Sequence, residues 1–106
     1  MTLTNQIMIN GWLIQATLGI LHTESPELCE VFRSTKAARQ DRGRGLLATY
    51  ELEMSHHEAT AIHSTLEQAR IKFGDERLFQ GMPLHSMSGM WRRYVERLDE
   101  GFGDGR

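Results

Sequence analysis

The longest regular pattern in the sequence is a stripe of small and apolar residues with helical spacing. The stripe consists of Ala48, Leu52, Ser55, Ala59, Ile62, Leu66, Ala69 and Phe73. This spacing is typical of one face of an α-helix. Ser55 and Glu58 fit a capping box that would begin a helix, and Gly74 is a residue type on which helices often end. We therefore expect helix over most of residues 46–73, with a break near Ser55.

The first part of this stretch also has a strand pattern. Apolar residues such as Tyr50, Leu52 and Met54 alternate with polar ones such as Glu51 and Glu53, which is typical of a half-buried β-strand. A single strand in a helical chain could pair only with a second copy of itself. The sequence therefore favours helix, and a single strand near 46–54 is the alternative.

The N-terminal region predicts a helix that is apolar around most of its circumference. It would span about residues 4–22 and begin at Thr4, whose hydroxyl can cap it. A helix of this kind is usually buried on two sides, and a short chain has few other helices to cover it. We therefore expect a homodimer seam or a partner groove on this helix, centred on Trp12 and Leu13.

The rest of the chain predicts further helices. One begins at Ser25 and Pro26 and runs into a basic stretch, and a short helical turn occupies residues 76–80. The last helix begins at Ser86 or Ser88 and ends at Gly101. Its apolar face consists of Met87, Met90, Trp91, Tyr94, Val95 and Leu98. The predicted fold is all-α, a small bundle of about four helices in one domain over residues 1–106, with a frayed glycine-rich end at 101–106.

Composition narrows the class of protein. The 106 residues fit one domain, and 40% hydrophobic with 25% charged residues is ordinary for a soluble one. Cys29 is the only cysteine, so it has no partner for an intrachain disulfide. The apolar run at 7–21 is too short and too interrupted to span a bilayer. We expect a cytoplasmic protein that does not associate with membranes.

Motifs for catalysis are missing from the sequence. It has no nucleophile elbow, phosphate-binding loop or dinucleotide-binding glycine pattern, so we expect neither an enzyme nor a cofactor. Glu53 and His57, four residues apart and next to His56, would share a helical face and could offer two metal ligands. The natural third ligand, Glu58 or His63, would lie on a different face, so a polar surface around the capping box is the favoured explanation. Cys29 is best explained as a small buried residue.

A basic stretch at 33–44 is the strongest electrostatic feature. It carries five cations and one anion, Asp41, for a local charge of +4 in a chain of net charge −2. Such asymmetry favours an acidic partner surface or a phosphate backbone, although cations also accumulate at solvated helix ends. Residues 75–93 can also be fitted to a helix-turn-helix, with Arg92 and Arg93 on the recognition helix, but Pro83 interrupts the turn.

Together these features predict a small helical protein-binding regulator that acts by stoichiometric docking. It would be an antiactivator or inhibitor that masks a transcription factor or another target protein with an acidic or apolar surface, and it would form a homodimer. The expected partner-binding residues are Trp12, Leu13, Arg33, Lys36, Arg39, Arg42, Arg44, Leu47, Tyr50 and Met54. The alternative is a transcriptional regulator that binds nucleic acid through residues 33–44.

Overall fold

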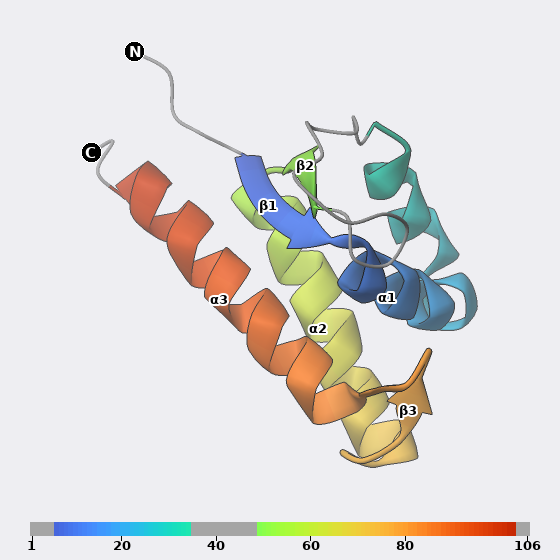
Figure 1. Cartoon of the computed structure of the whole chain (residues 1–106). Coiled ribbons are helices and arrows are strands. Elements are labelled where there is room, and N and C mark those ends of the chain that lie inside the picture. Colours follow the sequence, from blue (N-terminus) through green and yellow to red (C-terminus); the bar gives the residue numbers. More distant parts are fainter. Residues whose placement is uncertain (1–5, 35–48, 104–106) are drawn as a thin grey trace.

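The computed structural model describes the backbone of residues 6–34 and 49–103 and the side chains of residues 7–32 and 49–98. The described chain is mostly helical, with two short antiparallel strand pairs (Figure 1). Its elements are β1 (Gln6–Asn10), α1 (Gly11–Glu24), the 3-10 helix η1 (Pro26–Ser34), β2 (Thr49–Glu53), α2 (His56–Phe73), β3 (Leu78–Phe79), β4 (Met82–Pro83) and α3 (Leu84–Gly103). The all-α prediction is therefore correct for most of these residues and wrong for the strands.

The largest correction concerns the N-terminal helix, whose first part is strand β1. This strand pairs antiparallel with β2, with Ile7 opposite Leu52 and Ile9 opposite Tyr50. Ile7 and Ile9 are buried while Met8 between them is exposed, which is the alternation of a strand with one covered face. The strand alternative at 46–54 is thus confirmed for 49–53. The partner strand comes from the same chain, and a second copy is not needed.

Helix α1 begins after β1 because Asn10 caps it. The Asn10 side-chain oxygen accepts a hydrogen bond from the backbone N–H of Leu13 at 2.8 Å. This bond satisfies one of the donors left free in the first turn of a helix. The predicted cap, Thr4, lies outside the described residues, and the helix begins well after it.

The core lies between α2, α3, α1 and the inner face of the β1–β2 pair. Figure 1 shows α2 and α3 as long neighbouring helices, with β1 and α1 laid against them. Trp91 of α3 is fully buried near the centre, edge-on to Phe32 of η1 and to Tyr94. The Trp91 indole N–H donates to the Thr17 hydroxyl of α1 at 2.9 Å. The predicted apolar face of α3 is confirmed, since its residues are buried or pack on this core.

Most of the apolar residues in the N-terminal region are covered by this same core. The buried ones are Ile7, Ile9, Leu13, Ala16, Ile20 and Leu21. The sequence predicted a dimer seam because a short chain was expected to have too few helices to cover these residues. The inference missed the contribution of β2, α2 and α3, which cover them within one chain.

The predicted break near Ser55 and the predicted stop at Gly74 are confirmed, whereas the helix predicted before Ser55 is wrong over 49–53. The Ser55 hydroxyl accepts from the Glu58 N–H at 3.1 Å, and the Glu58 carboxylate accepts from the Ser55 N–H at 3.0 Å. At the other end Gly74 has a φ of 99°, which side chains with a Cβ rarely adopt. Its N–H closes the last turn on the Arg70 carbonyl at 2.9 Å.

Replacing Ser55 with alanine is expected to lower the free energy of unfolding by about 1 kcal/mol, because one donor of the first turn loses its acceptor. Urea denaturation followed by circular dichroism measures this loss. Ser64→Ala is the matched control, since Ser64 is exposed on the same helix, and it should change stability by less than about 0.5 kcal/mol. Equal effects of the two substitutions would show that the capping box contributes nothing.

The region after α2 differs from the prediction of a short helix at 76–80. It forms the hairpin β3–β4, whose two-residue turn has positive φ at both Gln80 (56°) and Gly81 (81°). Positive φ at both central residues is the geometry that joins two-residue hairpins without splaying the strands. This hairpin removes the first helix of the helix-turn-helix alternative at 75–93, which is therefore wrong.

The last helix also has different ends from those predicted. It begins at Leu84, directly after β4, so Ser86 and Ser88 lie inside it instead of capping it. Gly101 does not end it, because the helix continues to Gly103.

Candidate functional site

The ten predicted partner-binding residues do not form one surface in the structure. Leu13 and Met54 are buried in the core, so neither presents a side chain to a partner. Trp12 is exposed, and Tyr50 is half-buried and packs against the core. The side chain of Arg33 is not described, and Lys36, Arg39, Arg42, Arg44 and Leu47 lie outside the described residues.

Trp12 is the predicted contact residue that the structure places on the surface most clearly. Its side chain is 39% exposed at the start of α1. The indole N–H donates to the Gln80 carbonyl in the β3–β4 turn at 2.7 Å. The ring lies against Gly81, where an added Cβ would be 4.0 Å from a Trp12 ring carbon. The hydrogen bond therefore ties the indole to the hairpin turn, where Gly81 leaves room for it, while much of the residue stays open to solvent.

Met8 adds a second exposed apolar side chain near the N-terminal end of the fold. It is 52% exposed on the outer face of β1, and its carbonyl accepts from the Tyr94 hydroxyl at 3.0 Å. Burial of Tyr94 raises the pKa of this hydroxyl, so it remains a proton donor at neutral pH. The other exposed large apolar residues of the described chain are Leu78 on the hairpin and Ile71 on α2.

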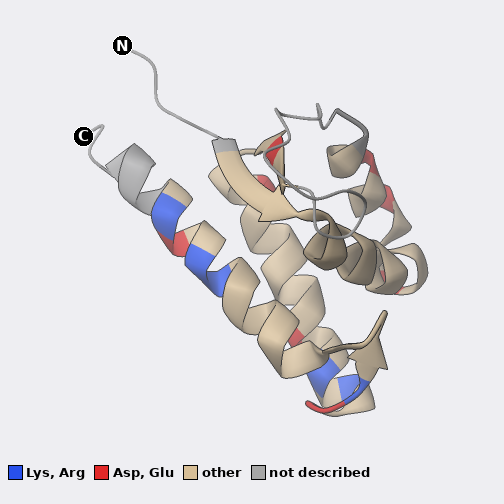
Figure 2. Cartoon of the chain, in the orientation of Figure 1, with Lys and Arg blue, Asp and Glu red and all other residues tan. Residues whose placement is uncertain are grey.

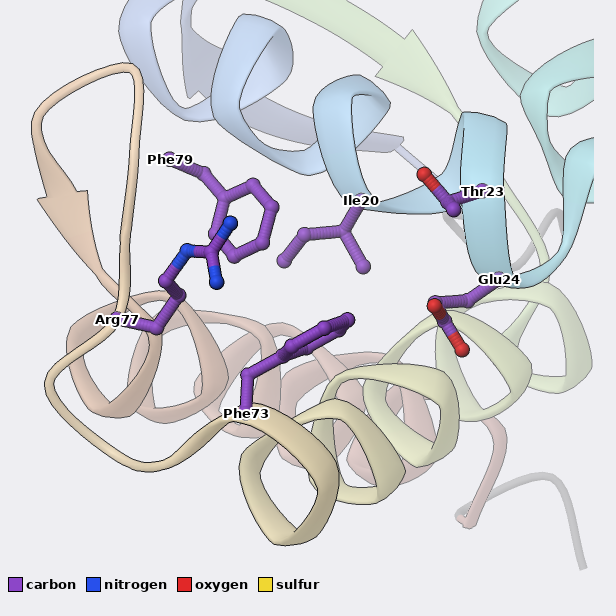
Figure 3. Close-up of a pocket in the computed structure, with 6 residues that line it drawn as sticks. All are labelled: Ile20, Thr23, Glu24, Phe73, Arg77 and Phe79. Carbon is purple, nitrogen blue, oxygen red and sulfur yellow. The ribbon is translucent and has the colours of Figure 1, made fainter.

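A pocket of about 240 Å³ lies where the ends of α1 and α2 meet the hairpin. Its lining residues are Ile20, Thr23, Glu24, Phe73, Arg77 and Phe79 (Figure 3). Figure 3 shows Arg77 reaching inward from the hairpin side, with Thr23 and Glu24 across the space on α1. Sequence reasoning missed this pocket because it predicted helix, not a hairpin, around Arg77 and Phe79.

Aromatic and charged contacts fix the pocket walls. The Phe73 and Phe79 ring centroids are 6.1 Å apart at an interplanar angle of 65°. The Arg77 guanidinium lies 5.2 Å from the Phe73 centroid and 5.3 Å from that of Phe79. The two cation–π contacts of Arg77 keep its guanidinium beside two apolar surfaces. At the opposite wall, the Lys72 ammonium pairs with the Glu24 carboxylate at 3.2 Å.

A polar cluster centred on Glu67 joins α2 to α3. The Glu67 carboxylate accepts from the buried Ser88 hydroxyl and from Arg70 at 3.1 Å, and His63 lies 3.5 Å away. Arg70 also contacts Asp75 at 2.9 Å. The Ser88 hydrogen bond, then Arg70, holds the pKa of Glu67 below its ordinary value. Because Ser88 is only 2% exposed, this network is an internal contact between α2 and α3.

Replacing Glu67 with glutamine is expected to lower the free energy of unfolding at pH 7 by about 1 kcal/mol. The loss is smaller than for a fully buried charged hydrogen bond, because the Glu67 side chain is 42% exposed. A carboxylate with a lowered folded pKa stabilises the fold above its unfolded value near 4.5 and loses this effect as pH falls below it. Urea titrations at pH 7 and pH 3 should therefore show the two proteins converging in acid. A difference of equal size at both pH values would contradict the role of the charge.

The described charges are distributed unevenly (Figure 2). The C-terminal half of α3 carries Arg92, Arg93 and Arg97, whereas η1 and β2 carry carboxylates. Arg92 pairs with Glu96 at 3.4 Å. Glu53 lies in β2 and His57 in α2, so the helical spacing proposed for a metal site is lost. Among the described residues, no group of three or more His, Cys, Asp or Glu could hold a metal ion.

Cys29 is half-buried and packs against the core. None of the helices in the described part of the chain is long and apolar enough to cross a membrane. Comparison of the chain with protein-family models, with curated proteins and with solved structures finds no match.

Proposed function

We propose that this chain is a small protein-binding regulator that acts by stoichiometric docking, and that Trp12 is the centre of its contact surface. The observation that supports this most strongly is the state of the Trp12 side chain. Its ring is open to solvent, but its single polar group is already bonded to Gln80 within the chain.

This arrangement suits a protein contact for two physical reasons. A partner that covers the ring removes apolar area from water without leaving the indole N–H unpaired. The ring is also held in place before binding, so little side-chain freedom is lost when the complex forms. Tryptophan is enriched among the residues that dominate binding energy at interfaces, and methionine, here Met8, is enriched across them.

The sequence adds an electrostatic element to this proposal. No side chain of the basic stretch at 33–44 is described, and its charge would favour a partner with acidic groups. A cytoplasmic antiactivator or inhibitor that covers a transcription factor remains the concrete form of the prediction. A homodimer through the same Trp12 surface is a further prediction.

The proposal is tested by capturing partners on the purified chain from a lysate of its native host, at low and high salt, and identifying them by mass spectrometry. The captured protein is then titrated against the wild type, Trp12→Ala and Ile71→Ala. We expect Trp12→Ala to weaken binding by at least about 30-fold, equivalent to about 2 kcal/mol. Ile71→Ala should bind normally, although Ile71 is 82% exposed.

Two controls make the result interpretable. Circular dichroism should show that both variants remain folded, and Trp12→Phe, which keeps one aromatic ring but loses the hydrogen bond to Gln80, should bind with an affinity between those of the wild type and Trp12→Ala. Sedimentation of the wild type and Trp12→Ala tests the homodimer. Equal affinities of the wild type and Trp12→Ala would overturn the proposed surface. Captured nucleic acid that washes off with salt would favour the alternative through residues 33–44.

A further inference from the structure

We propose that the pocket between α1, α2 and the β3–β4 hairpin binds a small organic carboxylate with a compact apolar body. The pocket is lined by residues other than Trp12, and the proposal does not depend on the proposed protein partner. It rests on the shape of the pocket, the state of Arg77 and the balance of charges around them.

The apolar part of the ligand would be held by three side chains. Ile20, Phe73 and Phe79 surround the open space in Figure 3. The Phe79 ring lies next to Gly19 of α1, where an added Cβ would come 3.9 Å from it. The volume of about 240 Å³ is below the usual range for drug-sized ligands. It suits a body such as one phenyl ring or a branched alkyl group.

Arg77 supplies the group that recognises the carboxylate. Its guanidinium carbon lies over both the Phe73 and the Phe79 rings, and its N–H donors make no hydrogen bond to a described side chain, so its planar fork can bind a ligand. Among the described residues, no carboxylate lies within ion-pair distance of Arg77, although most cations near it are paired. A ligand carboxylate could therefore form two parallel charge-assisted hydrogen bonds without displacing any contact of the chain.

Arg77 is the pocket cation that is available to an anionic ligand. Glu24 is the carboxylate of the pocket wall, and Lys72 already pairs with it through both oxygens at 3.2 and 3.3 Å. This ion pair neutralises the wall that lies across the space from Arg77. The C-terminal ends of α1 and α2 lie at the same pocket and oppose an anion through their helix dipoles, so a ligand carboxylate has to be held by direct hydrogen bonds from Arg77.

The experiment is an amide chemical-shift titration of the ¹⁵N-labelled full chain with three probes of similar shape. Phenylacetate carries the proposed charge, phenylacetamide is neutral, and benzylamine is a cation. We expect phenylacetate to give saturable shifts at residues of the pocket, with a millimolar Kd about tenfold lower than that of phenylacetamide. Benzylamine should bind no better than the amide.

Variants separate charge from shape. Arg77→Gln should raise the Kd of phenylacetate about tenfold and leave that of phenylacetamide nearly unchanged. Arg93→Gln is the matched control, because Arg93 is an exposed arginine on α3 away from the pocket, and it should have no effect. Glu24→Gln should bind phenylacetate as tightly as the wild type or more tightly, since it leaves the Lys72 charge unpaired.

The opposite results would overturn the proposal. They are the absence of saturable pocket shifts up to about 20 mM phenylacetate, tighter binding of benzylamine than of phenylacetate, and equal loss of phenylacetate affinity in Arg77→Gln and Arg93→Gln. If Arg77→Gln loosens the hairpin, its spectrum without ligand will show this. Arg77→Lys, which keeps the charge but not the planar fork, then serves as the second variant, and it should fall between the wild type and Arg77→Gln.

Discussion

Trp91→Ala is expected to lower the free energy of unfolding by about 3–5 kcal/mol, the usual cost of removing a large buried aromatic side chain. Trp91 is fully buried and touches elements from three parts of the chain. Its ring centroid lies 6.1 Å from that of Phe32 in η1 and 5.3 Å from that of Tyr94 in α3. Its indole N–H donates a hydrogen bond to the Thr17 hydroxyl of α1. A domain of this size is commonly stable by about 5–15 kcal/mol, so this single change would remove much of the total.

Thr17→Val separates the hydrogen bond from the packing around Trp91. Valine has nearly the shape of threonine, but it leaves the buried indole N–H without an acceptor, which should cost about 1–3 kcal/mol. Urea denaturation followed by far-ultraviolet circular dichroism measures both variants, and it does not depend on the fluorescence of Trp91. Trp12→Ala is the control, since the other tryptophan is partly exposed and should have a much smaller effect on stability. A Trp91→Ala protein as stable as Trp12→Ala would contradict the buried placement of Trp91.

The second large effect concerns the β1–β2 pair. Ile7→Ala and Leu52→Ala should each lower the free energy of unfolding by about 2–5 kcal/mol, because both side chains are buried on the inner face of the sheet. The two residues are directly opposite in the register. The loss in the double variant should therefore differ from the sum of the single losses by about 0.5 kcal/mol or more, as expected for residues in contact.

A thermodynamic cycle of the four proteins measures this coupling by urea denaturation. Met8→Ala is the matched control, since Met8 lies on the same strand but faces outward, and its loss should stay within about 0.5 kcal/mol. Ile7→Val replaces Ile7→Ala in the cycle if the double variant does not fold. Additive losses would show that Ile7 and Leu52 are not cross-strand neighbours, and the predicted helix at 46–53 would then have to be reconsidered.

Local signals in the sequence predicted those parts of the fold that depend on neighbouring residues. The capping box at Ser55 and the stop at Gly74 need only a few adjacent residues, and both are confirmed. The apolar face of α3 is likewise a property of one helix, and its residues lie in or against the core.

Features that depend on distant residues were not predicted. The alternation at 49–53 indicated a strand, but its partner at 6–10 was hidden inside a longer apolar pattern that fits a helix equally well. The first signal available was Asn10, a strong capping residue in the middle of the supposed helix. The hairpin was missed because Gln80 is not a residue type that marks a turn with positive φ, although Gly81 is.

The same distinction applies to the candidate sites. Trp12 and Leu13 were predicted together as partner contacts. Trp12 is exposed, but helix α1 turns Leu13 into the core. The pocket forms because Ile20, Phe73 and Phe79 come together from three different elements. No residue spacing in the sequence predicts this contact.

The pairing of β1 with β2 has a consequence for the order in which the chain can fold. Helices α2 and α3 are joined by a short hairpin and can pack as soon as both have formed. Strand β1 lies at the other end of the chain from α3 and must wait until all of α1 and η1 has been synthesised before β2 exists to receive it. Long-range contacts of this kind form slowly because a large loop must close first. During synthesis on the ribosome, the apolar side chains of β1 would therefore emerge well before β2 and would stay without their strand partner until residues 49–53 have followed.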